Sequence, residues 1–225
     1  MPAERYSLGD TIALLLPPGE TLRLKLRGLP RYFYSGRLEL ETVTQAACTR
    51  TAAAKYLVPD LAERCLTFVR DHMGTEDVCP FLDYVLTMHE EDLDVTARAI
   101  ILKDSIGVIL SSSFTRSTEL TVRYILRHVN KVPEVLVVKA VRDWAEQQCL
   151  TGSHGDGERA DVRAVMLPFF SELRFLALTS AEFVQGPIAW NILTDAEALA
   201  ILSNIIKEDS MAMPEGFCRI RKARK

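Results

Sequence analysis

The sequence has few of the residues from which metal and disulfide sites are built. Its 225 residues include five cysteines and four histidines, and no two cysteines form a CxxC pair. Because the number of cysteines is odd and their spacing wide, a disulfide framework does not fit, and no cysteine lies at zinc-finger distance from two histidines. We therefore expect reduced thiols, no bound metal and no cofactor, in a protein of the cytoplasm or the nucleus.

Long apolar runs and a strong excess of one charge are also missing. No run approaches the ~18–20 residues that a membrane-spanning helix needs. The apolar stretch at residues 11–16 is followed by Pro17, Pro18 and Gly19 without a small-residue cleavage site, so it does not fit a signal peptide. The formal net charge of −3 gives no electrostatic reason to bind nucleic acid or an anionic membrane. The sequence therefore predicts no nucleic-acid partner and no membrane.

No catalytic constellation can be assembled either. The chain has no glycine-rich phosphate loop and no Gly-x-Ser-x-Gly motif. His89 begins a His-Glu-Glu string, but Leu93 stands where a metalloprotease helix needs its second histidine. The carboxylates of residues 154–158 lack the spacing of a calcium loop, and Cys149 near His154 in sequence does not make a triad. We therefore predict that the chain is not an enzyme.

What the chain does contain is helical periodicity. Glycine and proline are few, at 11 and 10 residues, which favours helix. Thr179-x-x-Glu182 and Thr194-x-x-Glu197 have the form of capping boxes and predict helix starts near residues 180 and 195. Further predicted helices cover residues 46–57, 93–103, 104–112, 118–130 and 134–149, with two more beginning at Pro59 and Thr75. The predicted fold class is all-α, a stack of antiparallel helix pairs.

The first 30 residues depart from this pattern. Residues 11–16 and 21–27 flank a Pro-Pro-Gly-Glu turn, and the second arm alternates apolar with basic residues at period two. Such alternation buries one face of a strand and leaves the other in water. We therefore predict a short N-terminal β-hairpin ahead of the helices.

The candidate core consists of large apolar side chains on the helical stripes. Leu136, Val141 and Trp144 share one face of the helix predicted at 134–149. A tryptophan on such a stripe buries a large area whatever the function of the protein. The full set of candidate core residues is Phe68, Phe81, Leu136, Val141, Trp144, Leu173, Phe175 and Phe183.

A resemblance to a known family rests on several short strings. The Trp144 helix is followed by Leu-Pro-Phe-Phe-Ser-Glu-Leu-Arg-Phe at residues 167–175 and by Thr-Ser-Ala-Glu-Phe at 179–183. This order resembles the BACK domain, the helical module that follows the BTB/POZ domain in many adaptor proteins. Residues 175–195 look like the end of BACK in the subgroup in which a PHR-type β-sandwich comes next.

The resemblance also implies how the chain is divided. Residues 31–40 and 53–61 are similar to the end of a BTB domain. The implied parts are an atypical leader at 1–30, the C-terminal part of a BTB-like domain at 31–73, paired helices plus BACK at 74–205, and a basic tail or linker at 206–225. We expect the basic string at 219–225 to be a solvated linker, with a nuclear signal as the alternative. We also expect the chain to be a fragment or isoform, because only the last part of a BTB domain is recognised.

The function that the resemblance implies is protein binding without catalysis. BTB–BACK proteins act as substrate adaptors of cullin-3-type ubiquitin ligases, so the implied partners are a cullin-3-type scaffold and a substrate protein of unknown identity. In that family a tyrosine at the joint before the last BTB helix can lie in the cullin interface. Lys55, Tyr56 and Leu57 are therefore the candidate partner interface, and the helices from Thr75 to about Leu110 would form the upper half of a groove with Tyr56 at its floor.

Alternatives to this interpretation stay open. The ring of Tyr56 could instead pack inside the helical bundle. The chain could be a non-ligase scaffold, or a truncated isoform that cannot recruit cullin. A homodimer is also left open, although most of the BTB part that supports dimers is missing from the sequence.

Overall fold

The computed structural model describes residues 38–90, 93–151 and 161–224, and this part of the chain contains helices and turns but no strand. The predicted all-α fold class is thereby confirmed, whereas the hairpin predicted within residues 1–30 lies outside the described residues. The α-helices are α4 (Val43–Lys55), α5 (Pro59–His72), α6 (Thr75–Thr87), α7 (Asp94–Lys103), α8 (Ser105–Ile109), α9 (Glu119–His128), α10 (Glu134–Thr151), α11 (Val162–Met166), α12 (Ser180–Phe183) and α13 (Asp195–Ile206). Single helical turns cover Phe114–Arg116, Leu167–Phe169, Phe175–Ala177 and Val184–Ile188.

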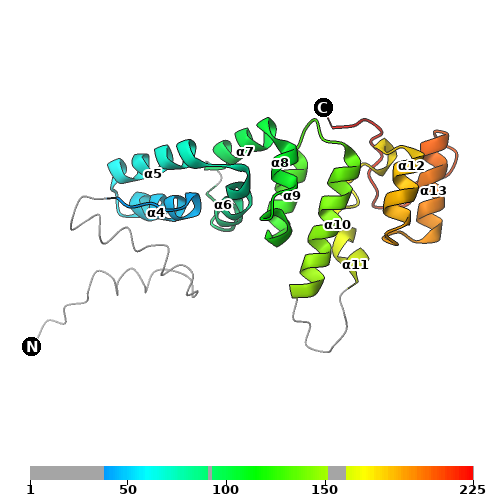
Figure 1. Cartoon of the computed structure of the whole chain (residues 1–225), viewed down its shortest axis with the longest axis horizontal. Coiled ribbons are helices and arrows are strands. Elements are labelled where there is room, and N and C mark those ends of the chain that lie inside the picture. Colours follow the sequence, from blue (N-terminus) through cyan, green and yellow to red (C-terminus); the bar gives the residue numbers. More distant parts are fainter. Residues whose placement is uncertain (1–37, 91–92, 152–160, 225) are drawn as a thin grey trace, which may run out of the picture.

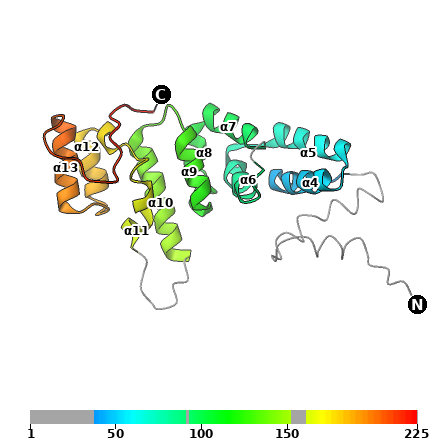
Figure 2. The same ribbon diagram turned by 180° about the vertical axis from the view of Figure 1, so that it is seen from behind.

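The helices follow one another along an elongated stack (Figure 1). The pair α4 and α5 forms one end of the stack, and α12 and α13 form the other. Figure 2 shows the same order from behind, with the long helix α10 crossing the middle. Because α10 packs against both α11 and the turn Phe114–Arg116, it joins the two halves of the stack.

Side-chain caps determine where several helices begin. The side chain of Thr42 accepts a hydrogen bond from the amide of Gln45 at the start of α4. Pro59 occupies the first turn of α5, where its missing N–H leaves no bond unmade. The predicted capping boxes at Thr179 and Thr194 are both confirmed, because each threonine exchanges hydrogen bonds with the glutamate three residues on. Local hydrogen bonds therefore favour these helix starts.

Most of the candidate core residues lie in one continuous apolar core that runs from α4 to the C-terminal segment. Trp144 is 4% exposed, its ring meets Phe169 edge-on at 5.2 Å, and its indole N–H donates to the carbonyl of Ser117 at 2.8 Å. Phe68 and Leu136 are only partly buried against this core, since Phe68 stacks on the His72 ring at 4.1 Å near the surface of α5. The fully buried candidates are Phe81, Val141, Leu173, Phe175 and Phe183.

The C-terminal segment folds back onto the helices, and the basic string predicted to be a solvated linker is solvated only in part: Arg219, Ile220, Lys222 and Ala223 are exposed, whereas Arg224 is buried. After α13 the chain returns to the middle of the stack, where the described residues end near α10 (Figure 1). We call residues 214–224 the strap. Phe217 is 8% exposed, and the amide of Cys218 donates to the carbonyl of Phe170 at 3.0 Å. The sequence suggested solvation because basic residues are usually exposed, but Arg224 has a buried partner.

That partner is Glu134, the first residue of α10. The guanidinium Nε of Arg224 donates to Glu134 Oε2 at 2.9 Å, and the two side chains are 5% and 1% exposed. The remaining guanidinium donors reach the carbonyls of Leu126 and Glu172 at 2.6 and 2.9 Å, and Glu134 Oε1 also accepts from the amide of Arg174 at 2.8 Å. The pair therefore ties the strap to α9, to α10 and to the segment between α11 and α12.

We predict that Arg224→Ala lowers the free energy of unfolding by about 3–5 kcal/mol, because it leaves the Glu134 carboxylate buried without a cation. The measurement is chemical denaturation of the full chain followed by circular dichroism. Arg221→Ala is the matched control: Arg221 pairs with Glu208 at 3.0 Å, but the Glu208 side chain is 69% exposed. Loss of that exposed pair is expected to change stability by about 1 kcal/mol or less. Equal losses in the two variants would contradict a decisive role for the buried pair.

Candidate partner-binding site

The described residues were searched for the groups from which metal sites and reactive thiols are built. Among them, no group of three or more His, Cys, Asp or Glu side chains could hold a metal ion, and no helix is long and apolar enough to cross a membrane. Burial raises the pKa of the Cys65 and Cys79 thiols to about 11. Burial, and then the charge of Asp161, also raises the pKa of Cys149. Because the thiolate is the nucleophile, these cysteines are poorly suited to covalent chemistry.

The turn between α4 and α5 contains the three residues of the predicted partner interface. Lys55 is the last residue of α4 and Tyr56 follows as its C-cap. The helix then closes with two reversed hydrogen bonds, from the amide of Val58 to the carbonyl of Ala53 at 2.9 Å and from the amide of Leu57 to the carbonyl of Ala54 at 3.2 Å. This pattern is the Schellman motif, which requires a left-handed residue just after the cap.

That left-handed residue is Leu57, with φ of 57°. Glycine is the usual residue there, and a side chain with a Cβ costs roughly 1–2 kcal/mol in the left-handed region. Burial does not offset this cost, because Leu57 is 87% exposed. His89 occupies the equivalent position after α6, at φ 55°, but histidine tolerates this conformation better. An exposed, strained leucine therefore marks this turn as a candidate contact surface.

Tyr56 adds to the same surface. Tyr56 is 37% exposed, so part of the residue is open to a partner while the rest is covered by the protein. Together with Leu57, it presents apolar area beside the charged side chain of the exposed Lys55. Of these three residues, tyrosine is the type that is enriched at protein interfaces and among the residues that contribute most of the binding energy.

A pocket of about 370 Å³ lies a short way along the stack, between α4, α5, α6 and α7. Its apolar walls include Phe81 and Leu93, and two arginines, Arg50 and Arg70, stand beside them. Arg50 forms an ion pair with Glu90. Tyr56 does not line this pocket, so it cannot be the floor of it. Arg70 is likewise paired, with Glu63 at 3.3 Å, so the pocket offers apolar walls without an unpaired charge from these two arginines. The sequence analysis did not identify Arg50 and Arg70, because no pattern of neighbouring residues shows that two positions 20 residues apart line one cavity.

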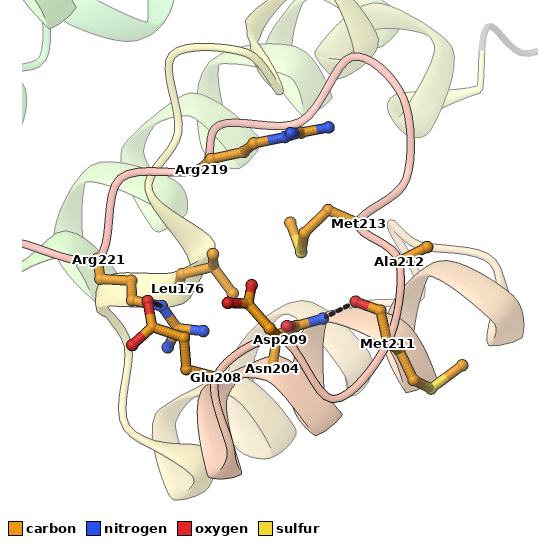
Figure 3. A pocket seen from close by; sticks show the side chains of 9 residues that line it. All are labelled: Leu176, Asn204, Glu208, Asp209, Met211, Ala212, Met213, Arg219 and Arg221. Atoms are coloured by element: carbon orange, nitrogen blue, oxygen red, sulfur yellow. Dashed lines mark hydrogen bonds and ion pairs between the residues drawn. The ribbon is translucent and has the colours of Figure 1, made fainter.

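A second pocket, of about 460 Å³, lies between the end of α13 and the strap (Figure 3). Asn204 anchors one wall by donating to the carbonyl of Met211 at 2.8 Å. The Glu208–Arg221 ion pair crosses from that side to the strap, and Arg219 reaches over the opening from the strap. Its charges of both signs give no preference for a cation or an anion, so the pocket alone indicates no ligand.

Several known proteins are similar to this chain. BTB/POZ domain-containing protein 6-B of Danio rerio is 30% identical over 167 residues, which are 74% of this chain and 34% of that protein. The human BTB/POZ domain-containing protein 6 is 29% identical over 174 residues, 77% of this chain and 32% of that protein. The human BTB/POZ domain-containing protein 3 is 29% identical over 120 residues, 53% of this chain and 23% of that protein.

These matches confirm the predicted resemblance to BTB/POZ proteins. The chain spans about a third of the length of the BTB/POZ domain-containing proteins 6 that it matches. No family model matches the chain. No solved structure matches it.

We predict that Leu57→Gly raises the free energy of unfolding by about 0.5–1 kcal/mol, because glycine relieves the left-handed strain and no buried contact is lost. Leu57→Ala is the matched control, since alanine removes the exposed side chain but keeps a Cβ in the left-handed region. Its stability is expected to stay within about 0.5 kcal/mol of the parent chain. Thermal and chemical denaturation of the three proteins measure the difference. If the glycine variant is no more stable than the alanine variant, Leu57 is not strained.

Proposed function

We propose that this chain, which is distantly homologous over most of its length to BTB/POZ domain-containing proteins 6 and 3, is a non-catalytic protein-interaction module. The observation that carries the proposal is the exposed turn of Tyr56 and Leu57 at one end of the helical stack. The left-handed backbone of the exposed Leu57 is expected to lower the free energy of unfolding of the free protein. Contact between this side chain and a partner would compensate for that cost. The raised thiol pKa values support a role without covalent chemistry.

We further propose that the partner at this turn is a cullin-3-type scaffold and that the chain serves as a substrate adaptor in the cytoplasm or nucleus. Tyr56 and Leu57 would insert into the partner, with Lys55 at the rim of the contact. The neighbouring pocket, with Phe81 and Leu93 in its walls, would receive an apolar side chain of the same partner. Since the turn and the pocket both involve α4 and α5, one extended surface of a partner could contact both.

The mechanism proposed for the adaptor is positional. The large apolar core runs from α4 to the C-terminal segment, and a second cluster of Ala53, Leu61 and Cys65 packs the α4–α5 end, so the two ends of the stack would be held at a fixed separation. A substrate held near one end would therefore meet the ligase bound at the other at a raised effective concentration. In this account the chain performs no reaction, and the bound ligase modifies the substrate.

We predict that the full chain binds the N-terminal domain of cullin-3 with micromolar or tighter affinity, measured by isothermal titration calorimetry. Tyr56→Ala is expected to weaken binding about tenfold or more, because it removes a central aromatic contact. Leu57→Gly is expected to weaken binding while raising stability, which separates loss of contact from loss of folding. Leu150→Ala is the control, since Leu150 is a 69% exposed leucine on α10, away from the turn; its affinity should match that of the parent.

A well-folded chain that does not bind cullin-3 would exclude the adaptor function. The alternative of a non-ligase scaffold would then be the better account. Equal weakening by Tyr56→Ala and Leu150→Ala would instead show that cullin-3 does not dock at the α4–α5 turn.

A further inference from the structure

Basic side chains gather at one edge of the helical stack. Figure 1 shows that the loop between α9 and α10 and the end of the described chain lie together at this edge. Lys103 ends α7 and Arg127 belongs to the last turn of α9, whereas Lys131, Arg174 and Lys222 lie outside the helices. We call these five residues the basic edge.

Hydrogen bonding brings the junction of α7 and α8 to the α9–α10 loop. The amide of Asn130 donates to Ser105 Oγ at 3.0 Å. Asn130 precedes Lys131 in the loop, and Ser105 begins α8 just after the end of α7 at Lys103. The exposed side chains of Lys103 and Lys131 therefore leave the backbone from neighbouring positions, although they are far apart in the sequence.

The strap brings the other cations to the same place. The guanidinium of Arg224 donates to the carbonyl of Leu126 at 2.6 Å, which puts the end of the strap next to Arg127. The guanidinium of Arg174 donates to the carbonyl of Lys222 at 3.0 Å. Arg127, Arg174 and Lys222 therefore lie around the end of the strap.

Few acidic groups oppose this charge. To other described residues, Arg127 alone of the five cations makes an ion pair, and its partner Glu172 lies 3.7 Å away. That carboxylate is already paired with Arg123 at 2.8 Å. Glu134 is buried in its pair with the strap, so the exposed carboxylate of Asp104 remains as the nearby negative charge. The basic edge thus has an excess of positive charge, although the chain as a whole has a formal net charge of −3.

Helix stability accounts for some of these cations but not for all. Lys103 and Arg127 lie at helix ends where the helix dipole favours positive charge. Lys131, in contrast, is exposed at φ 49°, a left-handed conformation that glycine or asparagine adopts at lower cost. Lys222 is exposed on the strap, outside any helix. These two lysines therefore fit a role in binding better than a role in folding.

We propose that the basic edge is a docking site for an acidic segment of a partner protein, in which several carboxylates lie close together. Hydrogen bonds between charged groups are roughly twice as strong as neutral ones. At physiological ionic strength a charge is screened beyond about 8 Å, so the local excess matters more for docking than the net charge of the chain. That net charge disfavours a long polyanion such as nucleic acid, which would extend past the edge. This inference is independent of the proposed cullin contact, because the basic edge and the α4–α5 turn share no residue.

The test uses the full 225-residue chain and a fluorescent peptide of about ten residues made of glutamate and glycine. We expect the peptide to bind saturably in fluorescence anisotropy at about 50 mM salt, and more weakly at about 200 mM. Lys131→Gln/Lys222→Gln should weaken binding about fivefold or more, because it removes two exposed cations. The same peptide with glutamine in place of glutamate should not bind.

The matched control is Arg116→Gln/Lys207→Gln, which removes the same charge at two exposed positions outside the basic edge. Its affinity for the glutamate peptide should stay within about twofold of the parent chain. Lys131→Arg/Lys222→Arg keeps the charge at the edge and should keep the binding, which separates loss of charge from any change in folding.

Equal weakening by the two glutamine variants would overturn the proposal, since the net charge of the chain would then account for the binding. Equal binding of the glutamate and glutamine peptides, or no binding of either, would overturn it as well. A single-stranded oligonucleotide of matched charge serves as the competing probe. If it binds the parent chain more tightly than the peptide does, the basic edge is not a site for an acidic protein segment.

Discussion

The packing of the strap against the helices of the C-terminal half depends on one buried carboxylate. Glu134 begins α10, where the helix dipole favours a negative charge, but its side chain is only 1% exposed and needs further compensation. Arg224 supplies it from 90 residues away in the chain. The same guanidinium satisfies the carbonyl of Leu126 at the end of α9 and that of Glu172. Arg224 therefore fixes the strap in place and satisfies hydrogen-bond acceptors in three segments of the chain.

Two regions of the molecule show opposite physical tendencies. The strap and the aromatic residues beneath it combine buried charge with ring packing, which specifies a single arrangement. At the α4–α5 turn, by contrast, Leu57 carries backbone strain without burial. Natural proteins tolerate such a residue where a partner covers it, and the proposed function assigns it that use. A rigid helical stack that exposes an apolar side chain at one end is the form expected of a docking module.

The features that could be predicted from the sequence are those that depend on residues close together in the chain. Capping boxes at Thr179 and Thr194 involve residues three apart, and the stripe of Trp144 follows from helical spacing, so both could be read directly. Tyr56 and Leu57 were proposed as interface residues from the resemblance, but the left-handed backbone of Leu57 could not be predicted, since leucine gives no signal for a left-handed turn. A basic string usually lies in water, as Arg219 and Lys222 do, but the burial of Arg224 could not be predicted, because only tertiary structure brings it to Glu134. The two pockets likewise join residues that no local pattern connects.

The central claim is that a partner docks at the α4–α5 turn of a stack that is otherwise complete. Hydrogen-exchange mass spectrometry of the chain with and without the N-terminal domain of cullin-3 tests it most directly. The account predicts slower exchange in the peptide segments that contain Lys55, Tyr56 and Leu57, and unchanged exchange in α10 and α13. Protection confined to α12 and α13, or none in a mixture shown to contain the complex, would contradict it.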